Sequence, residues 1–217
     1  MDLLHYQTLI FDCDGVILDS NRIKSEAFRT AALPYGDAAA NALVAWHVAN
    51  GGISRYQKFA HFLSDIVPAG QPGPDLQTLL TRYAAAVSDG LCSCAVAPGL
   101  AQLRARTQAA RWLIVSGGDQ AELRAVFAAR GLADMFDGGI FGSPDNKDQI
   151  LSRELTSGNI TGPALFLGDS TYDHRAARAA GLDFVFVSGW SEVVGWRDYV
   201  TEQRLSVIEN LEILTRT

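Results

Sequence analysis

Cysteines are few in this 217-residue sequence, positive charge does not predominate, and long apolar runs are absent. Three cysteines cannot build the disulfide framework of a small secreted domain, and Cys92-Ser93-Cys94 has no second pair with which to bind zinc. Eighteen basic against 24 acidic residues give a net charge of −6, which argues against nucleic acid as a partner. No apolar run is long enough to cross a bilayer, and the first residues lack the cationic start of a secretory signal. We therefore expect a cytoplasmic protein that binds neither nucleic acid nor membranes.

The composition is that of a folded protein, with 48% hydrophobic and 19% charged residues. Five short apolar runs recur along it, and a polar or glycine-containing turn follows each of them. Several of the turns lead into a helical pattern, and the runs themselves show no polar alternation, as in parallel strands buried on both faces. They span Thr8–Phe11, Trp112–Val115, Gly139–Phe141, Ala164–Leu167 and Phe184–Val187. This repetition predicts an α/β fold, a doubly wound parallel Rossmann-like sheet.

One segment between the first and second predicted strands interrupts this rhythm. From about Ser20 to Cys94 only helical periodicity is found, with breakers at Pro34-Tyr35-Gly36 and in residues 69–74. A helical insert of this size predicts a separate cap domain. We therefore expect an α/β core domain in residues 1–18 and 95–217, and an inserted α-helical cap domain in residues 19–94.

Four polar clusters follow the predicted strands, at the edge where open α/β sheets bind their ligands. They are Asp12-Cys13-Asp14-Gly15, Ser116-Gly117-Gly118-Asp119, residues 142–147 ending in Lys147, and residues 168–173 from Gly168 to Asp173. Carboxylates that converge there repel one another unless a cation neutralises them, and an all-oxygen ligand set suits Mg²⁺. Lys147 and the Ser116 hydroxyl add donors for phosphate oxygens. An aspartate in such a cradle can act as a nucleophile.

These clusters resemble the four motifs of the haloacid dehalogenase superfamily, in its phosphatase-type branch with a helical cap after the first strand. The first motif, DxDG and an apolar residue, matches Asp12 to Val16, and the second-motif Ser/Thr matches Ser116. The third-motif lysine matches Lys147, and the fourth motif, GDSxxD, matches Gly168 to Asp173. The resemblance covers the whole chain.

The resemblance implies a role for each matching residue. Asp12 would attack phosphorus and become a phosphoaspartate, and Asp14 would protonate the leaving alcohol and then activate water. The Mg²⁺ ligands would be Asp12, Asp14 through its main-chain carbonyl, Asp169 and, directly or through the surrounding shell, Asp173. The transferring phosphoryl group would be bound by Ser116, Gly117 and Lys147.

The insert segment around Gly51-Gly52-Ile53-Ser54-Arg55 has two interpretations. It is a linker before an N-cap serine, or it is similar to the substrate-specificity loop of capped sugar phosphatases and β-phosphoglucomutase in this superfamily. In the second interpretation Arg55 would hold the leaving group, with Ser54 and Lys58 beside it. The hinge residues Asp19, Ser20 and Asn21 would also contact substrate.

The expected function is Mg²⁺-dependent hydrolysis of a small phosphorylated metabolite, such as a sugar phosphate, through a phosphoaspartate. A sugar-phosphate mutase of the β-phosphoglucomutase type would use the same core residues. A phosphonatase would need a lysine from the insert, for which Lys24 and Lys58 are available, whereas Asp14 argues against a haloacid dehalogenase. A non-catalytic binding domain would not need both Asp12 and Asp14. The sequence indicates no oligomeric state.

Overall fold

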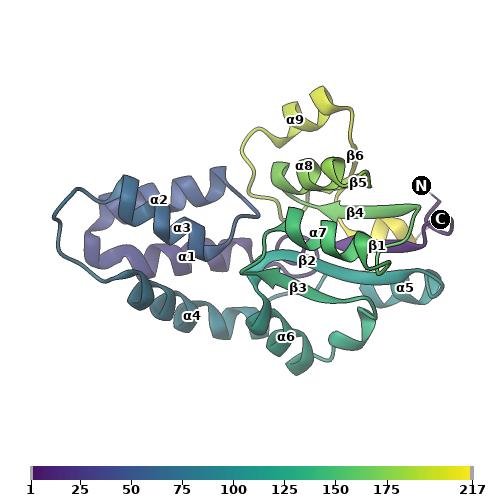
Figure 1. Ribbon diagram of the computed structural model, residues 1–217, viewed down its shortest axis with the longest axis horizontal. Helices are drawn as coiled ribbons and strands as arrows, with labels where there is room; N and C mark the ends of the chain where they lie inside the picture. Colours follow the sequence, from purple (N-terminus) through teal and green to yellow (C-terminus); the bar gives the residue numbers. More distant parts are fainter. Residues whose placement is uncertain (1, 216–217) are drawn as a thin grey trace.

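The computed structural model describes residues 2–215, which form a six-stranded parallel sheet with helices on both faces and a helical insert (Figure 1). The strand order is β3-β2-β1-β4-β5-β6, so β1 lies between the two halves of the sheet. The strands are β1 (Thr8–Phe11), β2 (Arg111–Asp119), β3 (Gly139–Ser143), β4 (Ala164–Gly168), β5 (Asp183–Val187) and β6 (Ser206–Ile208). The five predicted strands and the α/β class are confirmed. The sequence did not predict β6, because three residues at a half-exposed edge carry too little pattern.

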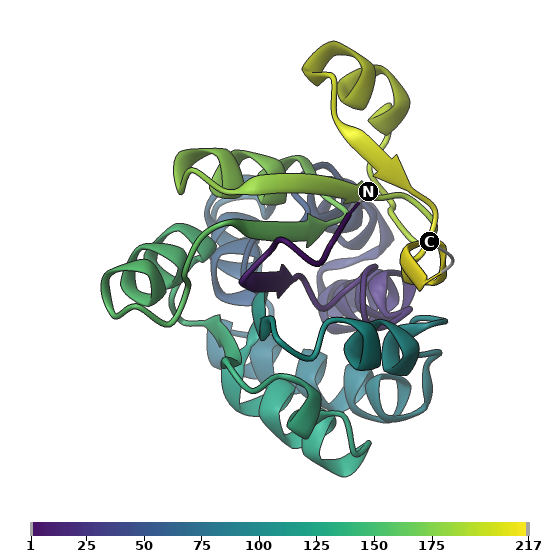
Figure 2. The same cartoon turned by 90° about the vertical axis from the view of Figure 1, so that its right-hand side faces the viewer.

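Alternate residues of each strand face opposite layers of helices. Leu9 and Phe11 of β1 belong to the larger core beneath α5 (Leu100–Arg106) and α6 (Gln120–Ala129). Ile10 belongs to a smaller core beneath α7 (Lys147–Thr156) and α8 (Thr171–Ala179). The two layers are visible on either side of the strands in Figure 2. Both faces are therefore buried, which explains why the strands are continuously apolar.

The remaining elements complete the core domain and its connections. A helix, α9 (Trp196–Gln203), precedes β6, and short 3₁₀ turns occupy Leu33–Tyr35, Ala133–Met135 and Leu211–Thr215. A π-helical segment, Phe62–Ile66, extends α3. Within residues 2–215 no helix has the length and apolarity that a membrane crossing requires.

The insert, residues 19–94, leaves the sheet after β1 and returns before α5, and it contains helices and no strand. Its helices are α1 (Asn21–Ala32), α2 (Asp37–Ala49), α3 (Arg55–His61) and α4 (Leu76–Ser93). Aromatic rings hold them together: Phe28 lies 5.1 Å from Phe59 and 4.4 Å from Tyr83 between ring centroids. The insert lies at one end of the molecule, and both ends of the chain lie at the other (Figure 1).

Candidate active site

Three aspartates meet at the carboxyl ends of β1 and β4. These neighbouring strands are in register, with Phe11 opposite Leu167, and the Asp12 amide donates to the Leu167 carbonyl at 2.9 Å. Asp12 therefore lies beside Asp169, which follows β4 directly. Asp173, in the first turn of α8, completes a cluster whose carboxylate oxygens lie within 4.8 Å of one another, and all three side chains are buried.

The electrostatics of this cluster favour a cation. Burial, together with the charges of Asp173 and Asp14, raises the pKa of Asp12 to about 7, even though Lys147 opposes the shift. Burial and the charges of Asp12 and Asp173 likewise raise the pKa of Asp169 well above its usual value. Three buried carboxylates with hard oxygen donors fit Mg²⁺, which would remove their mutual repulsion. The donor set thus fits the metal that the sequence predicts.

Lys147, the first residue of α7, is fully buried beside Asp12. Its ammonium forms ion pairs with Asp12 at 3.0 Å and with Asp173. Burial disfavours its charge, but the two carboxylates more than offset this and raise its pKa. Asn146 caps α7 just before it, with a capping box to Gln149, so the start of this helix fixes the lysine. Lys147 is therefore a permanent positive charge beside Asp12.

Ser116 and Gly117 lie in the last part of β2. The Ser116 hydroxyl accepts a hydrogen bond from the Gly118 amide at 3.0 Å and is fully buried. Gly117 faces the carbonyl of Gly52 in the insert so closely that a Cβ atom would collide with it. A glycine is required here because two backbone loops, one from the core and one from the insert, pass against each other. The predicted phosphate-binding segment is thus covered by Gly52 and Ile53.

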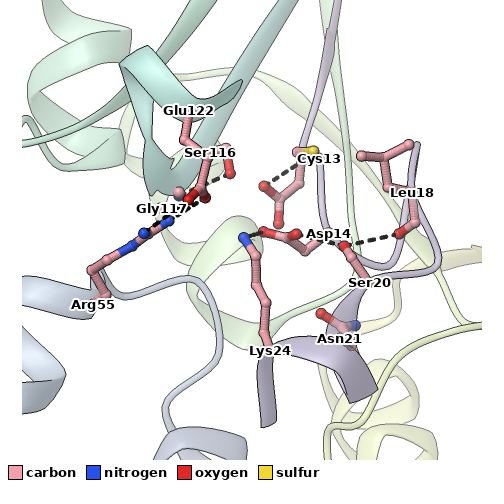
Figure 3. A network of polar contacts seen from close by, with 12 residues as sticks. Cys13, Asp14, Leu18, Ser20, Asn21, Lys24, Arg55, Ser116, Gly117 and Glu122 are labelled. Atoms are coloured by element: carbon pink, nitrogen blue, oxygen red, sulfur yellow. Dashed lines mark hydrogen bonds and ion pairs between the residues drawn. The ribbon is translucent and has the colours of Figure 1, made fainter. Parts of the chain in front are cut away.

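Asp14 is oriented by the insert rather than by the carboxylate cluster (Figure 3). Its carboxylate accepts hydrogen bonds from Ser20 Oγ at 2.6 Å and from the Lys24 ammonium at 2.5 Å. Burial opposes ionisation, but the charge of Lys24 and these hydrogen bonds lower the pKa of Asp14. Asn21 of α1 reaches the metal cluster instead, because its Nδ2 donates to Asp169 Oδ2 at 2.7 Å. The hinge and the start of α1 thus supply contacts to Asp14 and to Asp169.

Arg55 lines a pocket between the insert and the sheet. Its guanidinium, however, is bound to a carboxylate of the core (Figure 3). Its Nη1 donates to Glu122 Oε2 at 3.0 Å, and Nη2 pairs with Oε1 of the same side chain. Next to it, Tyr56 Oη donates to Asp119 Oδ2 at 2.7 Å. Asp119 is the N-cap of α6, as expected, and Ser54 is the N-cap of α3. The first residues of α3 therefore connect the insert to the first turn of α6.

We expect Arg55→Ala and Glu122→Gln to weaken the same connection between insert and core. Removing one partner leaves the other buried and unpaired, so each variant should lower the free energy of unfolding. In a double-mutant cycle followed by urea unfolding, the coupling should be about 0.5–3 kcal/mol. If the losses in unfolding free energy of the two single variants simply add in the double variant, the pair does not stabilise the contact between insert and core. Arg29→Ala, which removes an exposed pair with Asp37 within the insert, is the matched control.

A pocket lies between the insert and the carboxyl edge of the sheet. Its walls combine the aspartates of the core with side chains that no sequence motif marks. From the insert come Phe28, His47 and Tyr83; from the loop after β5 comes Glu192. No local signal marks these residues, because each is an ordinary member of a helix or loop until the elements pack. Lys24 and Lys58 also line this pocket.

Comparisons with known proteins agree with this geometry. The sequence profile of the haloacid dehalogenase-like hydrolases matches residues 6–181. Among curated proteins no sequence matches significantly.

Solved structures share the fold over nearly the whole chain. CbbY from Rhodobacter sphaeroides, in complex with phosphate, is 19% identical with a TM-score of 0.69, covering 96% of each chain. A haloacid dehalogenase-like family hydrolase from Streptococcus pneumoniae is 20% identical with a TM-score of 0.69, again over 96% of each chain. A protein described as a predicted phosphoglycolate phosphatase from Haemophilus somnus is 16% identical with a TM-score of 0.75, over 98% of each chain. At these identities the likeness shows the fold alone.

Proposed function

Because the chain belongs to the haloacid dehalogenase-like hydrolase family, we propose that it is a Mg²⁺-dependent phosphatase of a small phosphorylated metabolite. The observation that carries the proposal is the buried cluster of Asp12, Asp169 and Asp173 with Lys147 paired to two of its members. This arrangement combines a nucleophile, a cation site and a fixed positive charge at one point. The phosphatase relatives and the phosphate bound by the Rhodobacter protein support it.

In the proposed mechanism Asp12 attacks phosphorus and forms a phosphoaspartate, releasing the alcohol. Asp169, Asp173 and Asp12, with the main-chain carbonyl of Asp14, would hold Mg²⁺, which when bound would neutralise charge on the phosphoryl oxygens. Lys147 keeps Asp12 oriented and offsets negative charge as the phosphoryl group is transferred. Ser116 and the amide of Gly117 would bind phosphoryl oxygens.

Asp14 would serve as the acid and then as the base. In the free protein Lys24 and Ser20 favour its ionised form. An arriving phosphate is anionic and raises the pKa of a neighbouring carboxyl, so Asp14 can take up a proton as the substrate binds. It can then protonate the leaving oxygen, and the resulting carboxylate is ready to accept a proton from the water that attacks the phosphoaspartate.

The residues of the insert would act as the cap over this chemistry. The contact between Gly52 and Gly117 and the pairing of Arg55 with Glu122 cover the site, which would exclude bulk water. The similarity of residues 51–55 to the β-phosphoglucomutase loop was the argument for a mutase. In the structure the Arg55 guanidinium pairs with Glu122, so it is not free to bind a sugar phosphate. We therefore favour transfer to water over return of the phosphoryl group to a sugar.

The direct test is phosphate release from a panel of phosphorylated metabolites by the pure protein with Mg²⁺. The proposal would be supported if the wild-type protein released phosphate from at least one substrate several-fold faster, or more, than the Asp12→Asn variant. Isomerisation of a sugar phosphate without release of phosphate would identify a mutase instead. No reaction with any phosphate ester would contradict both functions.

A further inference from the structure

Three cations of the insert line the pocket, and two of them are neutralised by carboxylates. Lys24 pairs with Asp14 at 2.5 Å, and Arg55 pairs with Glu122. Lys58 differs, because among residues 2–215 no carboxylate lies within ion-pair distance of its ammonium. It is the one pocket-lining cation of the described chain without an acidic partner.

The charges of Asp14 and Asp12 act on Lys58 only from beyond contact distance, and the groups that touch its ammonium carry no negative charge. Its side chain is 2% exposed, and its Nζ lies 2.5 Å from His47 Nδ1 and 5.5 Å from the centre of the Phe28 ring. Burial, together with the Lys58 charge, lowers the pKa of His47 to about 2, so this imidazole is neutral. Because an ammonium only donates, His47 Nδ1 accepts and the imidazole proton resides on Nε2. The imidazole therefore orients Lys58 without neutralising it.

Leaving Lys58 unneutralised is costly for the folded protein. Burial and the positive charge of Lys24 lower the pKa of Lys58 to about 7. The remaining acid of the pocket, Glu192, accepts a hydrogen bond from Ser25 Oγ at 2.9 Å and does not contact Lys58. Buried charges are normally paired, so a solitary ammonium in a ligand pocket indicates that the missing anion arrives with the ligand.

We propose that Lys58 binds a second anionic group, a carboxylate or a second phosphate, on the organic part of the substrate. This inference rests on the proposed phosphatase function, in which Asp12 receives the phosphoryl group. Lys58 on α3 and Asp12 at the end of β1 line the same pocket, so one small molecule can contact both. Phosphorylated hydroxy acids or diol bisphosphates would supply this second anion, whereas a sugar phosphate whose only charge is the transferred phosphate would not.

The experiment compares matched phosphate esters on the full-length protein with Mg²⁺. One series is phosphorylated hydroxy acids with one, two or three carbons between carboxylate and ester oxygen. The second series replaces each carboxylate by a methyl group, and propane-1,3-diol bisphosphate tests a second phosphate. Lys58→Met keeps the length and removes the charge, and Arg29→Met removes an exposed cation of the same insert as the control.

The wild-type protein should prefer at least one anionic ester over its methyl counterpart by tenfold or more in kcat/KM. Lys58→Met should reduce that preference by tenfold or more, and Arg29→Met should retain it. Preference for the acid identifies a carboxylate, whereas preference for the bisphosphate identifies a second phosphate. Equal losses on esters with and without the second anionic group, or no preference in the wild type, would overturn the inference and leave the phosphatase function unaffected. Absence of turnover on every ester would contradict the phosphatase itself.

Two further readouts separate ligand binding from other roles of Lys58. Because removing an unpaired buried charge relieves its desolvation cost, Lys58→Met should raise Tm by about 2–4 °C or more at neutral pH without ligand. A lower Tm would mean that the lysine supports the fold, which would overturn the inference. Inactivation by borohydride in the presence of phosphonoacetaldehyde would also overturn the inference. It would show that this lysine forms a Schiff base and that the protein is a phosphonatase.

Discussion

Replacing Asp12 by Asn is expected to lower turnover by about a thousandfold or more, because no neighbouring group can replace the nucleophile. Asp169 and Asp173 are assigned to the cation site, and Asp14 is held away from the cluster by Lys24 and Ser20. The loss should appear in kcat for every substrate, since formation of the phosphoaspartate is common to all of them. Phosphate release under saturating substrate measures it.

The Asp12 variant should remain folded. Lys147 keeps its ion pair with Asp173, and an amide oxygen can still accept the hydrogen bond of the Cys13 amide. Circular dichroism and Tm check this point. Asp183→Asn, at the opposite end of the sheet, is the matched control and should retain full activity. Residual phosphatase activity above a few per cent in Asp12→Asn would contradict the phosphoaspartate mechanism.

Removing divalent metal is expected to abolish activity, and Mg²⁺ should restore it. The cluster of Asp12, Asp169 and Asp173 is buried and strongly self-repelling, and the substrate brings further negative charge to it. Ca²⁺ should inhibit, because its looser and higher coordination disturbs in-line geometry. Activity assays in excess chelator, followed by metal addition, test both expectations. Full activity in chelator would contradict the metal site and favour the dehalogenase alternative.

Metal binding should also be visible without substrate. A ligand that binds only the folded state raises Tm with its concentration, so Mg²⁺ should stabilise the wild-type protein. Asp169→Asn should remove most of this effect, whereas Asp183→Asn should preserve it. A Tm that is independent of Mg²⁺ in the wild type would place the metal elsewhere or exclude it from the free protein.

The sequence by itself determined five of the six strands and which polar residues lie at their carboxyl ends. Each strand-end cluster is local: Asp12 and Asp14 lie in the turn after β1, Asp169 follows β4, and Asp173 lies in the first turn of α8. Parallel strands place their carboxyl ends at one edge, so the order of elements was enough to predict that these residues meet. The helical insert was predicted for a similar reason, because helical periodicity and breakers are properties of short segments.

Only the tertiary structure decided how the insert meets the core. Arg55 and Glu122 are 67 residues apart, and nothing near either residue shows that they pair. The partners of Lys24 and Lys58 likewise depend on how α1, α2 and α3 pack against each other and over the sheet. Which cation is neutralised within the protein, and which is left for a ligand, follows from that packing. The proposed substrate recognition therefore depends on contacts between separate elements. Each predicted catalytic motif, by contrast, is contained in one short segment of the chain.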